Sequence, residues 1–211
     1  MTIKDYTSSS DAFADISEGT YSSSDYPAMA GFVTVASRLI DADFGRRAGF
    51  FYPTTDSVSF YYDGSNAKCQ TIDEFVSISA VAVAEQGGLS STDYTAWTLN
   101  TDYIVKPYNY AAMGKPINAL EIVFFNGVKA AFYGWQKSVL VTGIPGYSVT
   151  PPDLIVQATK TQAIRWFLRA KQGWQDTGAN SEFGQQQYKG MAELDSDVRA
   201  MLWALKLELM P

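Results

Sequence analysis

The stretch from Val139 to Arg169 reads VLVTGIPGYSVTPPDLIVQATKTQAIRWFLR and decides the fold, because it places a strand, a turn and a long helix in direct succession. Val139 to Thr142 is a run of strand-forming residues, and two glycines bound the turn that follows. The helix begins after Thr150, where prolines preset the backbone of the first turn and Thr150 and Asp153 have the spacing of a capping box. The sequence therefore predicts one strand and one helix joined by a tight turn.

The predicted helix has two apolar faces. On a wheel of 100° per residue, polar seams that include Gln157 and Arg165 separate two apolar stripes. The first stripe is Leu154, Ala158, Thr161, Ile164 and Leu168, and the second is Ile155, Val156, Ala163, Trp166 and Phe167. Two apolar faces need two packing partners, so we expect the first stripe to meet the chain's own core and the second to form the interface with a neighbouring subunit.

The composition is that of a globular protein with a net negative charge. Of the 211 residues, 46% are hydrophobic and 14% are aromatic, which is enough for a hydrophobic core. The formal net charge of −6 gives no electrostatic support for gripping a phosphate backbone. The first residues lack the apolar core of a signal peptide, and no apolar run is long enough for a membrane helix. The sequence therefore predicts a soluble protein that is made in the cytoplasm and has no membrane partner.

The chain contains no histidine. This excludes Ser-His-Asp and Cys-His nucleophile systems and removes the usual general base and a common metal ligand. A glycosidase needs only two carboxylates, but among Asp73, Glu74, Asp102 and Glu121 the sequence selects no pair. We therefore expect no enzyme activity and assign no catalytic, cofactor-binding or metal-binding residue.

The periodicity of apolar residues divides the chain into three kinds of segment. Residues 1–23 are rich in Ser, Thr, Tyr and Asp and are predicted to form a flexible N-terminal arm. Spacings of three and four residues predict a helical domain formed by 24–52 and 146–211, with a flexible loop from Gly173 to Gly190. Residues 53–145 change to a strand-like period and are predicted to form a β-domain inserted between the first two long helices.

The β-domain is predicted to hold a mostly antiparallel sheet or small barrel of about five or six strands. Its first strand, Val58 to Tyr62, is predicted to form a hairpin with Cys69 to Ile72 through the Asp63-Gly64 turn. The predicted fold class is α+β, a small helical bundle with an inserted antiparallel β-sheet or barrel domain.

The β-domain is also rich in tyrosine and tryptophan. These residues are Tyr94, Trp97, Tyr103, Tyr108, Tyr110, Tyr133 and Trp135. Exposed aromatic rings are suited to a sugar-binding face, but strand propensity and core packing explain the same residues about equally well. The sequence leaves both interpretations open.

A last helix, capped by Asp195 or Ser196, has more apolar residues than one inward stripe can use. The inward stripe is Val198, Met201, Leu202, Leu205 and Leu209. The residues that lie off this stripe are Trp203, Leu207 and Met210, followed directly by Pro211. We expect these four residues to dock on a partner, with extra core packing as an alternative of comparable weight. The N-terminal arm is the competing docking segment.

Several short motifs occur in a recognisable order. They are Ala36-Ser37-Arg38-Leu39-Ile40-Asp41 before Phe44-Gly45-Arg46, Asp102-Tyr103-Ile104-Val105-Lys106-Pro107, Val139-Leu140-Val141-Thr142-Gly143, Gly146-Tyr147, and Pro152-Asp153-Leu154-Ile155 with Ala158. This ordered set, spread from Tyr26 to Leu205, resembles the head-to-tail adaptor (connector) proteins of tailed double-stranded DNA bacteriophages. The large β insertion departs from the compact all-helical members of that family.

The resemblance implies a structural virion protein of the neck, between head and tail. It implies a homo-oligomer, a dodecameric ring that binds the portal protein and contacts the head-closure (stopper) or tail protein. Double-stranded DNA would pass through the ring without specific binding, and no catalysis or cofactor is implied. The docking residues of the last helix are then expected to meet the portal. The alternative function is a β-rich carbohydrate-binding module of a virion or a cell surface.

Overall fold

The computed structural model describes residues 3–16, 21–86, 90, 93–124, 129–171, 177–180, 184–187 and 193–209. The chain divides into a β unit, residues 52–149, and a helical unit that combines 3–51 with 150–211. Each unit has its own hydrophobic core. The described residues contain five helices and a six-stranded antiparallel sheet, so the predicted α+β class is confirmed.

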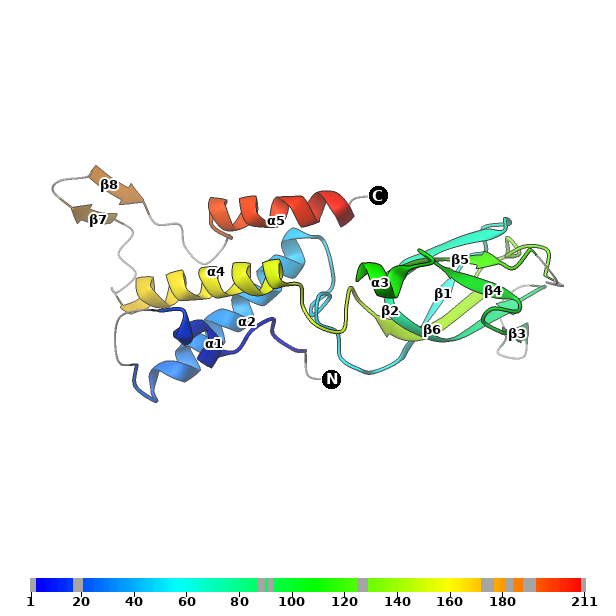
Figure 1. The fold of residues 1–211 in the computed structure, drawn as a ribbon, viewed down its shortest axis with the longest axis horizontal. Coiled ribbons are helices and arrows are strands. Elements are labelled where there is room, and N and C mark those ends of the chain that lie inside the picture. The colour runs from blue at the N-terminus through cyan, green and yellow to red at the C-terminus, as the bar shows by residue number, and fades with distance from the viewer. Residues whose placement is uncertain are drawn as a thin grey trace. The chain divides into compact units, whose positions relative to one another are not determined.

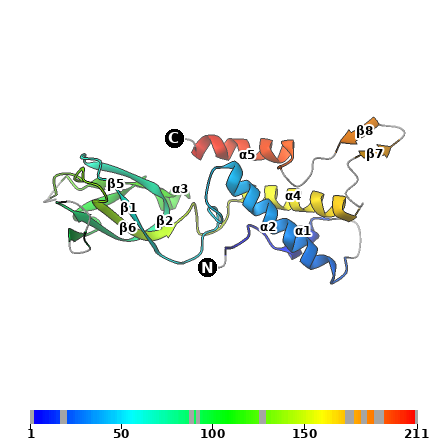
Figure 2. The ribbon, with the colours of Figure 1, turned by 180° about the vertical axis from the view of Figure 1, so that it is seen from behind.

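Three long helices make the frame of the helical unit. They are α2 (Asp25–Asp43), α4 (Asp153–Lys171) and α5 (Ser196–Leu209). Helix α2 crosses α4 obliquely and α5 runs alongside α4, as the two opposite views show (Figures 1 and 2). Gly45, with a φ of 63°, follows the end of α2 in the left-handed conformation that glycine adopts without strain. Helix α4 thus contacts both of the other long helices.

The first described residues belong to the helical unit. Helix α1 (Ser9–Ala14) begins after Ser8, whose Oγ accepts a hydrogen bond from the Asp11 amide at 3.1 Å. Phe13 is buried, and its ring packs edge to face on that of Phe167 in α4 at 5.2 Å. The expectation of a flexible arm is therefore wrong for residues 3–16, because their apolar side chains complete the core.

A buried polar cluster fixes the segment before α1 to α2. Tyr6 and Asp41 are both buried, and the Tyr6 hydroxyl donates a hydrogen bond to Asp41 Oδ1. The Gly49 amide donates to Asp41 Oδ2 at 2.9 Å, and the Tyr6 amide donates to Ser37 Oγ at 3.2 Å. Burial raises the pKa of Asp41 and that of Tyr6. The cluster joins the N-terminal segment, α2 and the loop after α2.

The sheet of the β unit consists of six strands, β1 (Val58–Tyr62), β2 (Cys69–Ala84), β3 (Tyr94–Trp97), β4 (Tyr103–Lys106), β5 (Ile117–Ile122) and β6 (Val139–Pro145). Their order is β1-β6-β2-β5-β4, with β3 paired to β2. A short helix, α3 (Tyr110–Met113), lies between β4 and β5. All paired strands are antiparallel.

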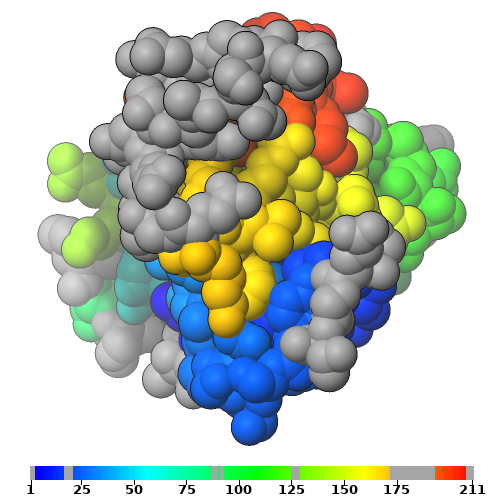
Figure 3. All heavy atoms as spheres, turned by 90° about the vertical axis from the view of Figure 1, so that its left-hand side faces the viewer, coloured from blue at the N-terminus to red at the C-terminus, as the bar shows by residue number. Residues whose placement is uncertain are grey.

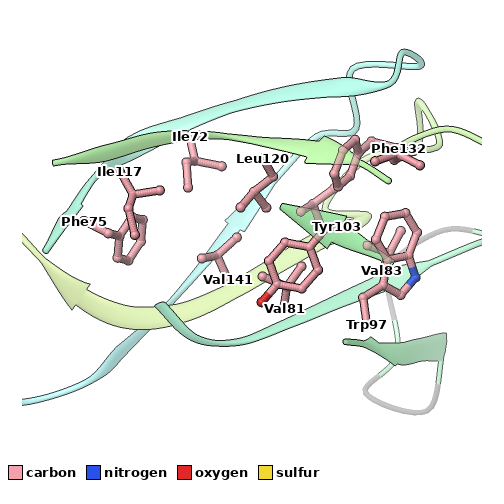
Figure 4. Packing of buried hydrophobic residues seen from close by; sticks show 12 residues of the cluster. Ile72, Phe75, Val81, Val83, Trp97, Tyr103, Ile117, Leu120, Phe132 and Val141 are labelled. Carbon is pink, nitrogen blue, oxygen red and sulfur yellow. The ribbon is translucent and has the colours of Figure 1, made fainter. Parts of the chain in front are cut away.

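Strand β2 belongs to both halves of the sheet. Its first part pairs with β5, and its second part pairs with β6 and β3. The register shifts twice in its pairing with β6, between Phe75 and Ser77 and between Ile78 and Ala80. Such irregularities let a strand bend from one layer to another. Side chains from both parts of β2 then meet those of the other strands in one core, in which Phe75, Leu120 and Val141 point inward (Figure 4).

Several local predictions differ from the structure. The hairpin of β1 with β2 is wrong, because β6 lies between these two strands. The strand expected at Cys69 to Ile72 continues to Ala84 as β2, while β3, α1 and α3 were missed because each is short. In the segment expected to be a loop, β7 (Thr177–Asn180) and β8 (Gly184–Gln187) pair as antiparallel strands.

Candidate docking surface on the C-terminal helix

Helix α5 buries one face against the helical unit. Val198 and Leu202 are fully buried, Leu205 is almost so, and Leu194 is buried just before the helix begins. Val198, Leu202 and Leu205 belong to the inward stripe that the sequence predicts, while Met201 of that stripe is only partly buried. Burying side chains of this size contributes about 1.5–3 kcal/mol each, so the helix has a firm apolar attachment.

Charged groups hold the first turn of α5 to α4. The guanidinium of Arg165 donates two hydrogen bonds to the Asp197 carboxylate, one of them at 2.6 Å. Arg169 Nη2 donates to Asp195 Oδ2 at 2.9 Å, and the Asp195 amide donates to Gln162 Oε1 at 2.8 Å. The hydrogen bonds from Arg165 lower the pKa of Asp197 to about 2. Planar guanidinium–carboxylate pairs fix orientation, so they set the direction in which α5 leaves α4.

The second half of α5 is held at the end of α2. Lys206 Nζ donates to the Asp43 carbonyl oxygen at 2.6 Å and forms an ion pair with the Asp43 carboxylate at 3.1 Å. A cation at the carboxyl end of a helix also complements the helix dipole. Helix α5 is thus attached at both of its halves, and its remaining face has a fixed orientation.

That remaining face carries an apolar stripe. Trp203 and Leu207 are each 55% exposed, and Ala200 and Ala204 are exposed beside them. These four positions have the spacing of one helix face, and we call them the outer stripe of α5. Trp203 and Leu207 are therefore placed off the buried face, as predicted, while Met210 and Pro211 lie outside the described residues. The alanines were missed because alanine contributes little to an apolar pattern.

Helix α4 gives a different result for the predicted subunit interface. Ile155, Ala163 and Trp166 are fully buried and Phe167 is 2% exposed, while Val156 is partly buried. Ala163, Trp166 and Phe167 pack in one cluster with residues of α1 and α2. The yellow and orange α4 lies between the blue N-terminal helices and the red α5 (Figure 3). The second stripe of α4 thus packs inside the chain, and the inference that it needs a neighbouring subunit loses its basis.

The first stripe of α4 is the more exposed of the two. Leu168, which was expected to face the core, is 40% exposed, and Leu154 and Ile164 are partly buried. Ala158 of this stripe is fully buried, as expected, but most of the buried apolar positions of α4 lie on the stripe that was assigned to the interface. The assignment depended on the N-terminal segment, whose polar composition concealed its buried anchors Tyr6 and Phe13.

Two arginines of α4 are paired with carboxylates, and one after α2 packs on an aromatic ring. Arg165 and Arg169 make ion pairs with Asp195 and Asp197, and the guanidinium of Arg46 lies 5.1 Å from the ring centroid of Phe50. Paired arginines present little unbalanced positive charge to a phosphate backbone.

The aromatic residues of the β unit do not share one face. Trp97 and Tyr103 are buried in the core, and Tyr110 and Tyr133 pack against it. Tyr108 and Trp135 are exposed, and Tyr94 is partly buried. Core packing thus accounts for four of the seven residues considered for sugar binding.

Among the residues that the structure describes, no group of three or more Cys, Asp and Glu side chains is arranged to hold a metal ion. No helix within the described ranges is both long and apolar enough to cross a membrane.

Comparison with known proteins adds information about the fold. No protein-family model matches the chain, and no curated protein matches it. A solved structure described as the neck of an empty GTA particle computed with C6 symmetry contains a similar chain, with a TM-score of 0.51 and 13% sequence identity. The match covers 97% of this chain and 94% of that one. A chain in the virion of a native gene transfer agent (GTA) particle matches with a TM-score of 0.49 and 13% identity over 94% of this chain. At this identity the likeness concerns the fold.

Proposed function

We propose that this protein is a structural component of the neck of a phage-like particle. In this role copies of the chain form a ring, a dodecamer, that joins the portal to the head-closure or tail protein. The observation that carries the proposal is the likeness of fold, over 97% of the chain, to a chain in a GTA neck. The order of sequence motifs that resembles phage adaptors supports the same role independently of the fold.

The outer stripe of α5 is the surface that we assign to the portal. An amphipathic helix that presents residues at i, i+3, i+4 and i+7 is suited to an apolar groove. Burying Trp203 and Leu207 in such a groove would contribute roughly 1.5–3 kcal/mol per side chain. In a ring the same contact is repeated, so the combined attachment is much stronger than one contact. Because α5 is already fixed on the helical unit, binding does not have to order this helix, and little of the free energy gained by burial is lost.

Double-stranded DNA is expected to pass through the ring without being held. The formal net charge of each copy is −6, and a ring multiplies that charge. Arg165 and Arg169, two basic residues near α5, are paired with carboxylates. A channel of this kind repels phosphate, so transit is not slowed by tight contacts.

The experiment compares variants for attachment to DNA-filled heads that lack the protein. In the test variant Trp203 and Leu207 are both replaced by Asp, and in the matched control Val35, an exposed apolar residue of α2, is replaced by Asp. The test variant should keep the melting temperature of the wild type, because both side chains are exposed in the free chain. It should fail to sediment with the heads, whereas the control should bind and appear as a ring by electron microscopy.

Retention of the test variant at the wild-type level would contradict the portal assignment of α5. Absence of any ring on heads incubated with the wild type would contradict the neck role itself. Deletion of the N-terminal segment is not an informative comparison, because Tyr6 and Phe13 belong to the core of the helical unit.

A further inference from the structure

The loop after β1 and the loop before β6 enclose a small open cavity in the β unit. Its volume is about 250 Å³, and it is lined by Asn66, Tyr133, Gly134 and Trp135. At about 30 Å³ per water molecule, this is room for roughly eight waters, which is less than the pockets that hold drug-sized ligands. One ring of a small molecule fits such a space, and a longer ligand would extend out of it.

Hydrogen bonds fix the walls of the cavity. The main-chain N–H of Gly64 donates to the Trp135 carbonyl oxygen at 3.2 Å, and that of Asn66 donates to the Phe132 carbonyl oxygen at 2.7 Å. The indole N–H of Trp135 donates to the Glu85 carbonyl oxygen at 3.0 Å, which holds the plane of the ring. The cavity is therefore formed without a ligand, and binding has little to order.

The lining combines an aromatic ring with a carboxamide. Trp135 is 53% exposed, so much of its ring is open to a ligand. The side chain of Asn66 is exposed, and its carboxamide makes no hydrogen bond with any residue that the structure describes. A Cβ atom on Gly134 would lie 3.1 Å from Asn66 Cβ, so glycine leaves this side chain its space. A ligand that satisfies both walls has an apolar face and several hydrogen-bonding groups.

We propose that this cavity binds one neutral pyranose ring of a carbohydrate. The C–H face of a pyranose packs on an indole ring, and its hydroxyls both donate to and accept from a carboxamide. A purely apolar group, such as the ring of a proline, would cover the Asn66 carboxamide without giving it a partner, which costs free energy. A phosphate or a carboxylate would find no counter-charge, because all four lining residues are uncharged.

The open shape of the cavity determines how strong the binding can be. One ring that is covered on one side gives a dissociation constant on the order of 1 mM or weaker. Several copies held on one particle would bind a polysaccharide with repeated units more firmly, because the weak contacts add. The inference does not rest on the neck role, since the whole cavity lies within the β unit of one copy.

The test measures binding of the full chain to the methyl glycosides of glucose, galactose, mannose and N-acetylglucosamine by saturation-transfer NMR. Asn66→Gly removes the carboxamide, and glycine adopts the φ of 53° found there without strain. The matched control is Asn100→Gly, the same exchange at another exposed asparagine, with a φ of 63°. At least one glycoside should bind the wild type and the control equally, and Asn66→Gly should bind it about threefold to tenfold more weakly.

A second pair of variants tests the aromatic wall. Trp135→Ala should lose detectable binding, whereas Tyr108→Ala, at a residue that is 62% exposed elsewhere in the β unit, should bind as the wild type does. The melting temperature of each variant shows whether it is folded, and Asn66→Gly tests the site even if Trp135→Ala unfolds.

The proposal is overturned if none of the four glycosides binds the wild type at about 50 mM. It is also overturned if Asn66→Gly binds as tightly as Asn100→Gly. Binding of N-acetylproline amide in place of every glycoside, with the same dependence on Trp135, would mean that the cavity takes a peptide. Failure of the protein to attach to heads would leave these outcomes unchanged.

Discussion

At the scale of single residues, the Tyr6 hydroxyl connects three segments of the helical unit. It donates to Asp41 and accepts a hydrogen bond from the Phe51 amide at 3.3 Å. The variant Tyr6→Phe leaves a buried carboxylate without one of its donors, which costs about 1–3 kcal/mol. Urea unfolding should show this loss at an unchanged m-value. Tyr26→Phe, at an exposed aromatic of the same unit, should stay within about 0.5 kcal/mol of the wild type; equal effects would contradict the role of the buried cluster.

Gly64 provides a second residue-level prediction. A Cβ atom at this position would lie 1.7 Å from the carbonyl oxygen of Tyr133, so the backbone of one segment must move. Gly64→Ala should therefore destabilise the β unit by about 1–3 kcal/mol. Gly31 lies within α2 and has nothing within 4 Å of the added atom, so Gly31→Ala should stabilise by roughly 0.5–1 kcal/mol. Thermal unfolding should therefore show a lower melting temperature for Gly64→Ala and a higher one for Gly31→Ala than for the wild type.

These residues show where a sequence pattern is ambiguous. Asp63-Gly64 has the composition of a hairpin turn, but the structure requires Gly64 for the close approach of another backbone segment. Tyr6 lies in a polar stretch that is typical of mobile arms, because one buried tyrosine and one buried phenylalanine make no period. Both errors arise from contacts between residues far apart in the chain, which no local pattern contains.

At the scale of elements, α4 shows which of its faces stabilises the fold. Phe167 is buried against α1 and contacts Tyr21, whereas Leu168 is 40% exposed on the neighbouring position. Phe167→Ala should cost about 3–5 kcal/mol, and Leu168→Ala should cost well under half of that. Chemical denaturation of both variants measures the two losses in the free energy of unfolding. A larger loss for Leu168→Ala would mean that the face of α4 with Leu168, and not the face with Phe167, stabilises the fold.

Long periodic helices were predictable, and their partners were not. Apolar spacing identified α2, α4 and α5, and it also identified the side of α5 on which Trp203 and Leu207 lie. The wheel of α4 supplied two stripes of similar apolar content, and the choice between core and interface required the position of α1. Short elements such as β3 and α3 gave no period, since each spans about one turn or two side-chain alternations.

At the scale of the whole molecule, the two units differ in how they use the chain. The core of the β unit is built from residues within 52–149 alone. The core of the helical unit combines residues that precede this segment in the sequence, such as Met29, with residues that follow it, such as Trp166. A fragment of residues 52–149 should therefore fold alone, with dispersed amide signals in its NMR spectrum and cooperative thermal unfolding. A fragment of residues 3–51 should not. An unfolded 52–149 fragment would show that its core depends on the helical unit.

The placement of the β unit between the two parts of the helical unit also has a consequence for synthesis on the ribosome. The apolar face of α2 is covered by α4, and residues 52–149 are translated between these two helices. At roughly 5–20 residues per second, about 5–20 s pass before α4 follows α2 out of the ribosome. During this interval Met29 and Val33 have no α4 to cover them, and they are available to a chaperone or to a second nascent chain. The helical unit is therefore the last to close, although its first half is translated before the β unit.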